Sequence, residues 1–184
     1  LVAASMVDDE PLVLYKGSAS GWTTVVVAET TKHFRKLALV DLDSDGILDL
    51  VACNKSEVYW FPNIGGEFGA GIQIEADTGA FVMSVATGDI DSDGDVDMVF
   101  GNHQTIRSFT NDGSGSFTKS NLVLGNTPIG VFALGDINGD GDLDLVVGTS
   151  DNQPDLVLQN DGNGVFTDSG QRLGSSRTTA ISLG

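Results

Sequence analysis

Short apolar segments separated by short polar turns run through the whole chain in one repeating order. In each repeat, one apolar segment leads into an acidic loop and a second leaves it, a third follows a brief polar turn, and a fourth follows a turn rich in Asn and Gly. β-Branched and aromatic residues bounded by Gly, Asn and Asp are typical of strands, and no helical periodicity is sustained. The chain is therefore predicted to be all-β. The expected strands are residues 37–40, 50–53, 58–61 and 68–74, then 82–86, 98–101, 106–109 and 117–124, then 131–134, 145–148, 156–158 and 166–173.

Two landmarks give the length of the repeat. The acidic loops start at residues 41, 89 and 136, which are 48 and then 47 residues apart. Turns with the same period begin at Asn63, Asn111 and Asn160 and end at Phe68, Phe117 and Phe166. Trp22 stands where the Phe of the repeat before is expected, so it is predicted to lie in the core. Four short strands in about 48 residues match one four-stranded antiparallel blade of a β-propeller, and the up-and-down order argues against a Greek-key sandwich.

The repeats predict that residues 1–184 are a single β-propeller segment of about four tandem units. The units are residues 1–35 (partial), 36–81, 82–129 and 130–175, and residues 176–184 are expected to be the first strand of a further unit. The favoured interpretation is a part of a larger propeller. The alternative is a closed four-bladed ring in which the last strand completes the first blade, because closure removes exposed sheet edges.

The charge of the chain is concentrated in the acidic loops. The formal net charge is −17 although only 19% of the residues are charged, and the three loops hold 13 of the 26 acidic residues. Clustered carboxylates repel one another unless a cation lies between them. A surface of this sign disfavours nucleic acid and anionic membranes as partners. No apolar run is long enough for a membrane span, no basic-then-apolar leader opens the chain, and the lack of an initiator Met leads us to expect a true N-terminus upstream.

The first loop shows why these residues suit a metal ion. Asp41, Asp43 and Asp45 occupy positions 1, 3 and 5 of a nine-residue loop, and alternate side chains of a tight loop can converge on one point. Gly46 at position 6 permits a sharp bend. Position 7 offers only its backbone carbonyl, and an Asp at position 9 closes the shell. The predicted ligand residues are Asp41, Asp43, Asp45, Ile47 and Asp49; Asp89, Asp91, Asp93, Asp95 and Asp97; and Asp136, Asn138, Asp140, Asp142 and Asp144.

Five or more hard oxygen ligands favour Ca²⁺ over the other common ions. Mg²⁺ requires stricter octahedral geometry, and Zn²⁺ and Cu²⁺ prefer imidazole or thiolate, which the loops lack. Three Ca²⁺ sites are therefore expected. The third is predicted to bind more weakly, because Asn138 is neutral. An EF-hand loop differs, since it closes with Glu at position 12 and continues into a helix.

These loops and their period resemble the FG-GAP/VCBS repeat family. The pattern D-x-[DN]-x-D-G-x-x-D is the calcium motif of that family and stands at all three places, so the resemblance covers essentially the whole chain. The repeat of this chain is also similar to the repeats of integrin α-subunit heads. The resemblance implies a propeller, often of seven blades, with Ca²⁺ in the hairpin between the first two strands of a blade. The family includes adhesion, ligand-binding and scaffolding proteins beside enzyme domains, so the fold does not settle the function.

Few other residues point to chemistry. The single cysteine, Cys53, excludes an internal disulfide and is predicted to be a small, partly buried thiol. His33 and His103 are predicted to be surface or turn residues. Tyr59 and Trp60 are interpreted as core, with a sugar-stacking platform as the alternative. The sequence Asn54-Lys55-Ser56 is a glycosylation acceptor and agrees weakly with secretion.

The resulting hypothesis is a non-catalytic, extracellular structural, adhesion or ligand-binding module that Ca²⁺ makes rigid. No nucleophile–base pair or phosphate loop is recognisable. Extracellular calcium modules bind with Kd of about 10⁻⁴–10⁻³ M, so such sites fill outside the cell. A protein or glycan is expected at a propeller face or edge, at loops 30–36, 75–80 and 126–130, and neighbouring chains of a surface assembly remain an alternative. Two further alternatives are the propeller portion of a secreted lyase or dehydratase acting on carbohydrate, and a lectin-like module.

Overall fold

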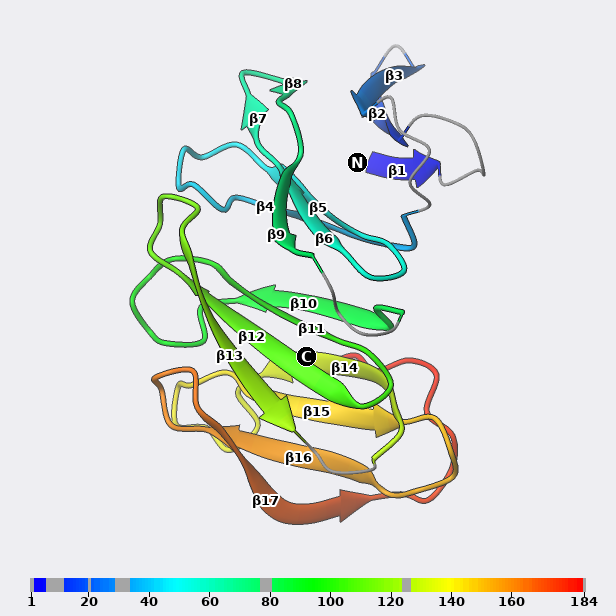
Figure 1. The fold of residues 1–184 in the computed structure, drawn as a ribbon, viewed down its shortest axis with the longest axis vertical. Coiled ribbons are helices and arrows are strands. Elements are labelled where there is room, and N and C mark those ends of the chain that lie inside the picture. The colour runs from blue at the N-terminus through cyan, green and yellow to red at the C-terminus, as the bar shows by residue number, and fades with distance from the viewer. Residues whose placement is uncertain are drawn as a thin grey trace.

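The computed structural model describes residues 2–5, 12–19, 21–28, 34–76, 81–123 and 127–183 (Figure 1). Every regular element in these ranges is a β-strand, which confirms the all-β prediction. The described residues contain no helix of the length and apolar character that a membrane span requires. The strands are β1 (Val2–Ser5), β2 (Leu12–Ser18), β3 (Gly21–Ala28), β4 (Lys36–Val40), β5 (Asp49–Cys53), β6 (Val58–Phe61), β7 (Asn63–Ile64), β8 (Glu67–Phe68), β9 (Ile72–Glu75), β10 (Ser84–Gly88), β11 (Asp97–Gly101), β12 (Thr105–Asn111), β13 (Phe117–Val123), β14 (Ile129–Gly135), β15 (Asp144–Thr149), β16 (Asp155–Asn160) and β17 (Phe166–Leu173).

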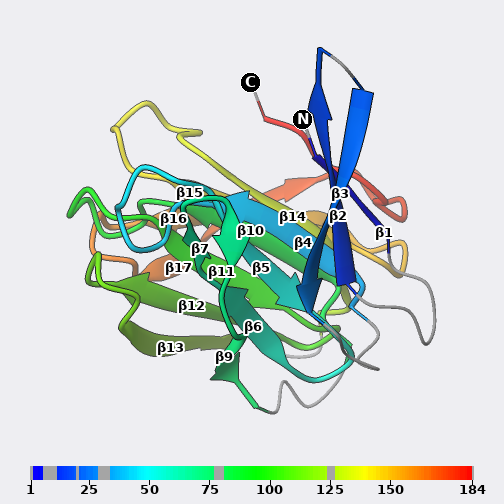
Figure 2. The ribbon, with the colours of Figure 1, turned by 90° about the horizontal axis from the view of Figure 1, so that it is seen from above.

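The strands form four successive sheets, which we call blades 1 to 4. Blade 1 is β1-β2-β3, blade 2 is β4-β5-β6-β9, blade 3 is β10-β11-β12-β13 and blade 4 is β14-β15-β16-β17. Neighbours in sequence are neighbours in the sheet, and every pairing is antiparallel. Figures 1 and 2 show the blades stacked face to face in chain order. The predicted four-stranded antiparallel blades of a propeller are therefore confirmed.

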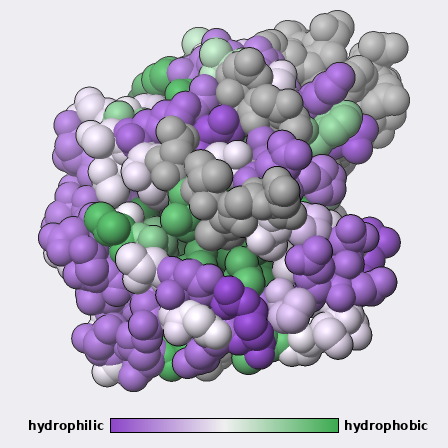
Figure 3. All heavy atoms as spheres, turned by 60° about the horizontal axis from the view of Figure 1, so that its bottom comes forward, coloured by the Kyte–Doolittle hydropathy of each residue, from purple (hydrophilic) through white to green (hydrophobic). Residues whose placement is uncertain are grey.

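The hydrophobic core lies between neighbouring blades rather than inside any one of them. Strand β5 shows the reason, because Leu50 and Ala52 pack into the core shared with blade 1 while Val51 and Cys53 pack into the core shared with blade 3. A strand buried on both faces needs apolar residues at every position, which accounts for the uninterrupted apolar segments after each acidic loop. Each large side chain buried in this way contributes about 1.5–3 kcal/mol, so stacking of blades is the main stabilising interaction. On the face in Figure 3, hydrophilic side chains predominate and hydrophobic ones form small separate groups.

The fourth strand of blade 2 differs from the prediction of one strand over 68–74. It is divided into β8, which pairs with β7 in a short hairpin, and β9, which pairs with β6. Gly65 and Gly66 have φ of 66° and 102°, a backbone region that favours glycine, and they form the hairpin turn. Gly71 lies so close to the Phe61 ring that a Cβ atom would come within 2.6 Å of it. The local Gly content therefore breaks the strand.

Residues 176–183 form no assigned strand, in contrast to the expected first strand of a further unit. The segment lies against blade 4, where the backbone N–H of Thr178 donates to the carbonyl of Thr149 at 2.9 Å and its hydroxyl donates to Asp155 at 2.7 Å. Leu183 packs against Gly135. A strand requires a hydrogen-bonded neighbour along its length, and the segment meets blade 4 mainly through side chains. Residue 184 lies outside the described residues.

The prediction that Trp22 lies in the core is wrong. Its side chain is 60% exposed on β3. At the equivalent position, Phe117 and Phe166 pack into the cores that their blades share with the preceding blade. In the described part of the chain no blade precedes blade 1, so Trp22 has no such core to enter.

Candidate metal centre

Each acidic loop joins the first two strands of a blade, between β4 and β5, β10 and β11, and β14 and β15. We number the residues of each loop from 1 to 9, and refer to loops 1, 2 and 3 in blades 2, 3 and 4. Position 6 is Gly46, Gly94 or Gly141, with φ of 86°, 97° and 98°. A side chain disfavours this backbone region, so the predicted role of the glycine in the bend agrees with the geometry. Position 4 also has positive φ in every loop, at Ser44, Ser92 and Gly139.

The Asp at position 1 closes the loop through hydrogen bonds from the backbone. Asp41 accepts the N–H of Asp45 at 3.2 Å on one carboxylate oxygen and the N–H of Gly46 at 2.8 Å on the other. Asp89 accepts the corresponding pair from Asp93 and Gly94. The Asp at position 5 then accepts the N–H of position 7, as Asp45 does from Ile47 at 2.7 Å. The loops are thus bent around their own carboxylates, whose other lone pairs remain for a cation.

The Asp at position 9 is fully buried and joins the loop to the rest of its blade. In loop 1, Asp49 Oδ2 accepts the N–H of Leu42 at 3.1 Å and the indole N–H of Trp60 at 2.9 Å, and Oδ1 accepts the N–H of Asn63 at 2.7 Å. In loops 2 and 3, Asp97 and Asp144 accept the N–H groups of the equivalent residues, Ile90 and Asn111, and Ile137 and Asn160. Sequence reasoning assigned these residues a ligand role alone and missed the anchoring role.

The Asp at position 3 carries an unsatisfied oxygen in the first two loops. Asp43 Oδ1 and Asp91 Oδ1 are buried and have no hydrogen-bond partner in the described part of the chain. Burial raises the pKa of both carboxyls, and the charges of Asp49 and Asp45 add to this for Asp43. Burial likewise raises the pKa of Asp97 to about 6, against the opposing effect of its backbone hydrogen bonds. A buried carboxylate oxygen without a donor is unfavourable, so Asp43 Oδ1 and Asp91 Oδ1 fit a site for a cation.

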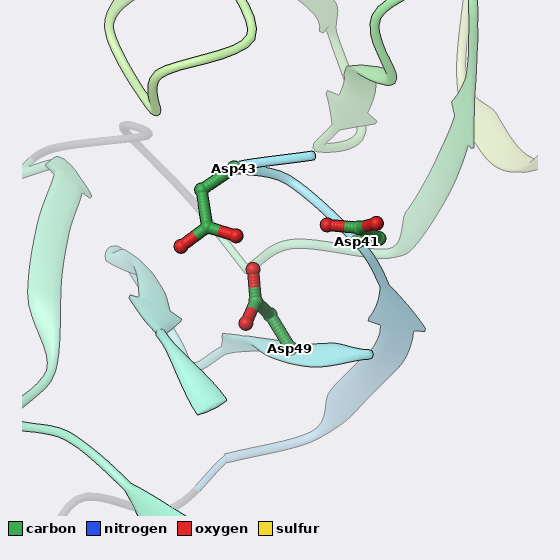
Figure 4. Close-up of side chains that lie close together, drawn as sticks. All are labelled: Asp41, Asp43 and Asp49. Atoms are coloured by element: carbon green, nitrogen blue, oxygen red, sulfur yellow. The ribbon is translucent and has the colours of Figure 1, made fainter. Parts of the chain in front are cut away.

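The structure brings positions 1, 3 and 9 together in loops 1 and 2. One carboxylate oxygen from each of Asp41, Asp43 and Asp49 lies within 4.8 Å of the others, and Figure 4 shows the carboxylates of Asp43 and Asp49 turned toward each other. In loop 2, Asp89, Asp91 and Asp97 form the same group. These are hard oxygens at a spacing that one divalent ion spans.

Loop 3 is more open than the other two. Asp136 and Asn138 are exposed, whereas the residues at positions 1 and 3 of the other two loops are half-buried. Asn138 turns its side-chain amide to Asp140, with Nδ2 donating to Oδ2 at 2.7 Å. Among the described residues, loop 3 does not form a comparable group of three carboxylates. Position 2 differs in the same sense, since Leu42 and Ile90 are fully buried while Ile137 is 40% exposed.

The remaining candidate residues do not form a second site. Trp60 is only 5% exposed and packs edge-on against Phe117, so the sugar-stacking platform on Tyr59 and Trp60 is wrong and the core interpretation holds. Burial raises the pKa of the Cys53 thiol to about 12, which makes it unreactive. Asn54 is buried and its side chain bonds Ser56 and Glu57, so this acceptor sequence is not presented for glycosylation. His103 is exposed.

Several predicted positions fall outside the described residues. His33 is one, and the proposed partner loops 30–36, 75–80 and 126–130 are described only at 34–36, 75–76 and 127–130.

Comparison with known proteins supports the repeat assignment. A family model described as FG-GAP-like repeat matches residues 41–100, 89–147 and 136–184, which together make up more than half of the chain. A comparison with curated proteins gave no match.

Solved structures share the fold at low sequence identity. A lectin of Agrocybe aegerita, described by its specific recognition of non-reducing terminal N-acetylglucosamine, aligns with a TM-score of 0.68 and 20% identity over 95% of this chain and 49% of its own. A structure of BBS1N in complex with ARL6DN aligns with a TM-score of 0.58 and 11% identity over 94% of this chain and 55% of its own. The Dos1 propeller aligns with a TM-score of 0.51 and 14% identity over 88% of this chain and 40% of its own. The chain therefore spans about half the length of the first two structures and less of the third.

Proposed function

The chain belongs to the FG-GAP-like repeat family, and on this premise we propose that its three acidic loops bind Ca²⁺ and that it is a non-catalytic, extracellular binding or adhesion module. Two observations on Asp43 and Asp91 carry the proposal: each has a buried, unpartnered carboxylate oxygen, and each has a carboxylate oxygen within 4.8 Å of those of two further Asp residues. A cation supplies the missing partner. Hard oxygen donors, with no imidazole or thiolate among the loop residues, favour Ca²⁺.

The loop residues contribute to holding the ion in three ways. Positions 1, 3 and 5 supply carboxylates (or the Asn138 amide), position 7 supplies its carbonyl, and position 9 uses the lone pairs that its hydrogen bonds leave free. In each loop the ion offsets the repulsion among these carboxylates and links the hairpin to the second strand. The role of the ion is structural, because it stabilises the end of each blade at which the acidic loop lies.

The extracellular role follows from the affinity expected of such loops. Calcium modules outside the cell bind with Kd of about 10⁻⁴–10⁻³ M, far above cytosolic calcium. A calorimetric Kd well below micromolar would contradict this part of the proposal. The activity of any longer protein that contains the chain is likewise a proposal.

The decisive experiment compares thermal unfolding in about 2 mM CaCl₂, in about 2 mM MgCl₂ and in excess chelator. Three sites, each at ten times its Kd, add roughly 4 kcal/mol by mass action. For a domain of this size the expected rise in Tm is on the order of 10 °C. A rise specific to Ca²⁺ supports the proposal, and equal Tm values in all three solutions would refute it.

A second candidate function is glycan binding, which one feature of the surface favours. A groove of about 340 Å³ lies between the outer strands β9 and β13, with Phe109 and Phe117 among its apolar lining and Gln73, Glu75 and Lys119 as its polar groups. Lys119 forms an ion pair with Glu75 across the two blades. Apolar surface with a few convergent polar groups is typical of small-ligand sites. The fold shared with an N-acetylglucosamine-recognising lectin makes a neutral sugar the first ligand to test.

A glycan array followed by titration with N-acetylglucosamine tests this candidate. We expect binding that Lys119→Ala weakens at least several-fold and that Gln171→Ala, on the exposed face of β17, leaves unchanged. A blank array, or equal loss with both variants, would exclude the groove.

A further inference from the structure

The Asn that begins the turn after the third strand of each blade contacts the acidic loop of its own blade. The backbone N–H of Asn63 donates to Asp49 at 2.7 Å, that of Asn111 to Asp97 at 2.7 Å, and that of Asn160 to Asp144 at 3.0 Å. The sequence shows these residues only as landmarks of the repeat. In the structure they hold the buried carboxylate at position 9 of each loop.

In blades 3 and 4 the side chain of this Asn also contacts the loop of the preceding blade. Asn111 Nδ2 donates to the carbonyl of Leu42 in loop 1 at 2.7 Å and to that of Val96 in loop 2 at 3.1 Å. Asn160 Nδ2 donates to the carbonyl of Ile90 in loop 2 at 2.7 Å and to that of Leu143 in loop 3 at 3.1 Å. One buried amide group therefore joins two loops in each case.

The bonded carbonyls belong to residues that matter for the geometry of the loops. Leu42 and Ile90 occupy position 2, and their own N–H groups donate to Asp49 and Asp97. Fixing the peptide unit after position 2 therefore fixes the segment between the carboxylates at positions 1 and 3. A second, exposed link runs in parallel, where Ser44 donates to Asp95 at 3.1 Å and Ser92 donates to Asp142 at 3.3 Å.

We propose that Asn111 and Asn160 are positioning residues that couple ion binding in adjacent blades, so that Ca²⁺ in one loop raises the affinity of its neighbour. The inference rests on the proposed function of the loops. An ion that orders Asp97 in loop 2 also orders the backbone of Asn111, whose amide holds position 2 of loop 1. The loop that binds second then has less conformational freedom to lose, which is positive coupling without a change of fold. Coupling of this kind is reciprocal between the two sites.

The contacts also rank the loops. Loops 1 and 2 each receive an amide bond from the following blade, and loop 3 receives none from the described residues. Position 2 of loop 3, Ile137, is 40% exposed, in keeping with that difference. Loop 3 is therefore expected to bind most weakly, beyond the effect of the neutral Asn138.

The chain contains a spectroscopic reporter that is bonded to loop 1. It has two tryptophans, and the indole N–H of Trp60 donates to Asp49 in that loop at 2.9 Å. Terbium is a hard cation that replaces Ca²⁺ and luminesces when a nearby indole is excited. With Trp22→Phe in every variant to remove the other indole, terbium luminescence is weighted toward loop 1, to which Trp60 is bonded, and its displacement by added Ca²⁺ gives the calcium affinity of that loop.

The test compares loop 1 with loop 2 intact and disabled. Asp91→Asn removes the central carboxylate of loop 2, and we expect it to lower the calcium affinity of loop 1 by about 5-fold or more, the range of typical coupling energies. Asn111→Ala is expected to lower the affinity of loop 1 by itself and to reduce the further effect of Asp91→Asn to what the Ser44–Asp95 link transmits. Asn63→Ala is the matched control, because the side-chain amide of Asn63 bonds Leu48 and Gly66, both within blade 2, and the effect of Asp91→Asn should persist in this variant. All titrations are made at about 0.15 M salt, which weakens direct charge effects between loops.

The failure of this inference is distinguishable from the failure of the proposed function. Terbium luminescence that calcium displaces equally well with and without Asp91→Asn overturns the coupling while the calcium sites stand. No terbium signal and no calcium-dependent rise in Tm overturn the sites themselves. If Asn111→Ala does not fold, the comparison of the chain with and without Asp91→Asn, both with Asn111 intact, still tests the coupling, because the calcium affinity of loop 1 either changes or stays the same.

Discussion

The loops of blades 2 and 3 differ from the loop of blade 4 although all three share one sequence pattern. In the first two, three carboxylates converge, position 2 is fully buried and the amide of the next blade completes the loop. In the third, Asp136 at position 1 and Asn138 at position 3 are exposed, and Ile137 is 40% exposed. The difference teaches that an acidic loop of this kind is finished by the blade that follows it. Local sequence bends the loop, and the neighbouring blade excludes water from it.

The largest expected effect is the loss of calcium stabilisation at low pH. The raised pKa values of Asp43, Asp91 and Asp97 all belong to the first two loops. For Asp97, raised from 3.8 to about 6, the folded chain holds the proton more tightly, so in chelator its contribution to stability is present below pH 3.8 and is lost as pH rises through about 6. Ca²⁺ binds the ionised form, so its effect has the opposite sign. The difference in Tm between calcium and chelator, on the order of 10 °C near neutral pH, should therefore become smaller as pH falls through about 6, the pKa of Asp97 in loop 2.

Melting curves at several pH values check this, and the chain carries an internal control. The Arg172 guanidinium lowers the pKa of Asp168 to about 2, so the stability from that pair is lost only as pH falls through that value, below the window used. A calcium-dependent difference that is equally large near pH 5 and near neutral pH would contradict the assignment of these carboxyls as ligands.

The next largest effect concerns the buried Asp at position 9. Asp97→Ala leaves the N–H groups of Ile90 and Asn111, both bonded at 2.7 Å, without a partner, and we expect the free energy of unfolding to fall by about 3 kcal/mol. Asp144→Ala removes longer bonds of 3.2 and 3.0 Å in the more open loop, and about 2 kcal/mol is expected. Urea denaturation in chelator measures both without a contribution from metal. A larger loss for Asp144→Ala would reverse the ranking of the loops.

A smaller effect, with opposite signs in two solutions, is expected at position 3. Asp91→Asn removes a half-buried charge that lies beside Asp93 and Asp89 and has one unpartnered oxygen, so in chelator it should stabilise the chain by less than about 1 kcal/mol. In calcium it should reduce the stabilisation by roughly the share of one site, about 1.4 kcal/mol at ten times Kd. Asp151→Asn, at an exposed carboxyl outside the three loops, is the control and should change neither value as much. Destabilisation by Asp91→Asn in chelator would show that the orphaned oxygen has a partner after all.

The smallest effect tests why loop 3 is weaker. Asn138→Asp restores the carboxylate that loops 1 and 2 carry at position 3, and it removes the 2.7 Å bond from Asn138 to Asp140. We expect the calcium affinity of loop 3 to rise by less than about tenfold, equivalent to less than about 1.4 kcal/mol, and to stay below that of loop 1. Calorimetric titration measures it. If loops 1 and 3 had equal calcium affinities after the substitution, charge alone would explain why loop 3 binds more weakly, and the following blade would not contribute to the difference.

The sequence predicted more about each blade than about the contacts between blades. Strand order, the acidic loops and the bend at Gly46 follow from residue types at fixed short spacings, and these predictions agree with the structure. The prediction of an undivided strand over 68–74 is wrong, because Gly65, Gly66 and Gly71 break it. The prediction that Trp22 is buried fails for a different reason. Trp22 takes the position of a Phe in the repeat, and such a Phe is buried by the preceding blade, which blade 1 lacks among the described residues. A sequence repeat shows which positions are equivalent within their blades. Two equivalent positions have the same environment only where the same neighbouring blade packs against both.

The period, the all-β character and the clusters of carboxylates were determined by the sequence alone, since each depends on chemistry within about ten residues. The tertiary structure decided which of the equivalent loops is complete, and it gave Asp49, Asp97 and Asp144 their buried anchoring bonds. It also made Asn111 and Asn160 bridges to residues 69 and 70 positions earlier in the chain. Contacts at that separation form only when one blade packs on the next, because the free energy of burying both faces of each second strand brings the two loops together.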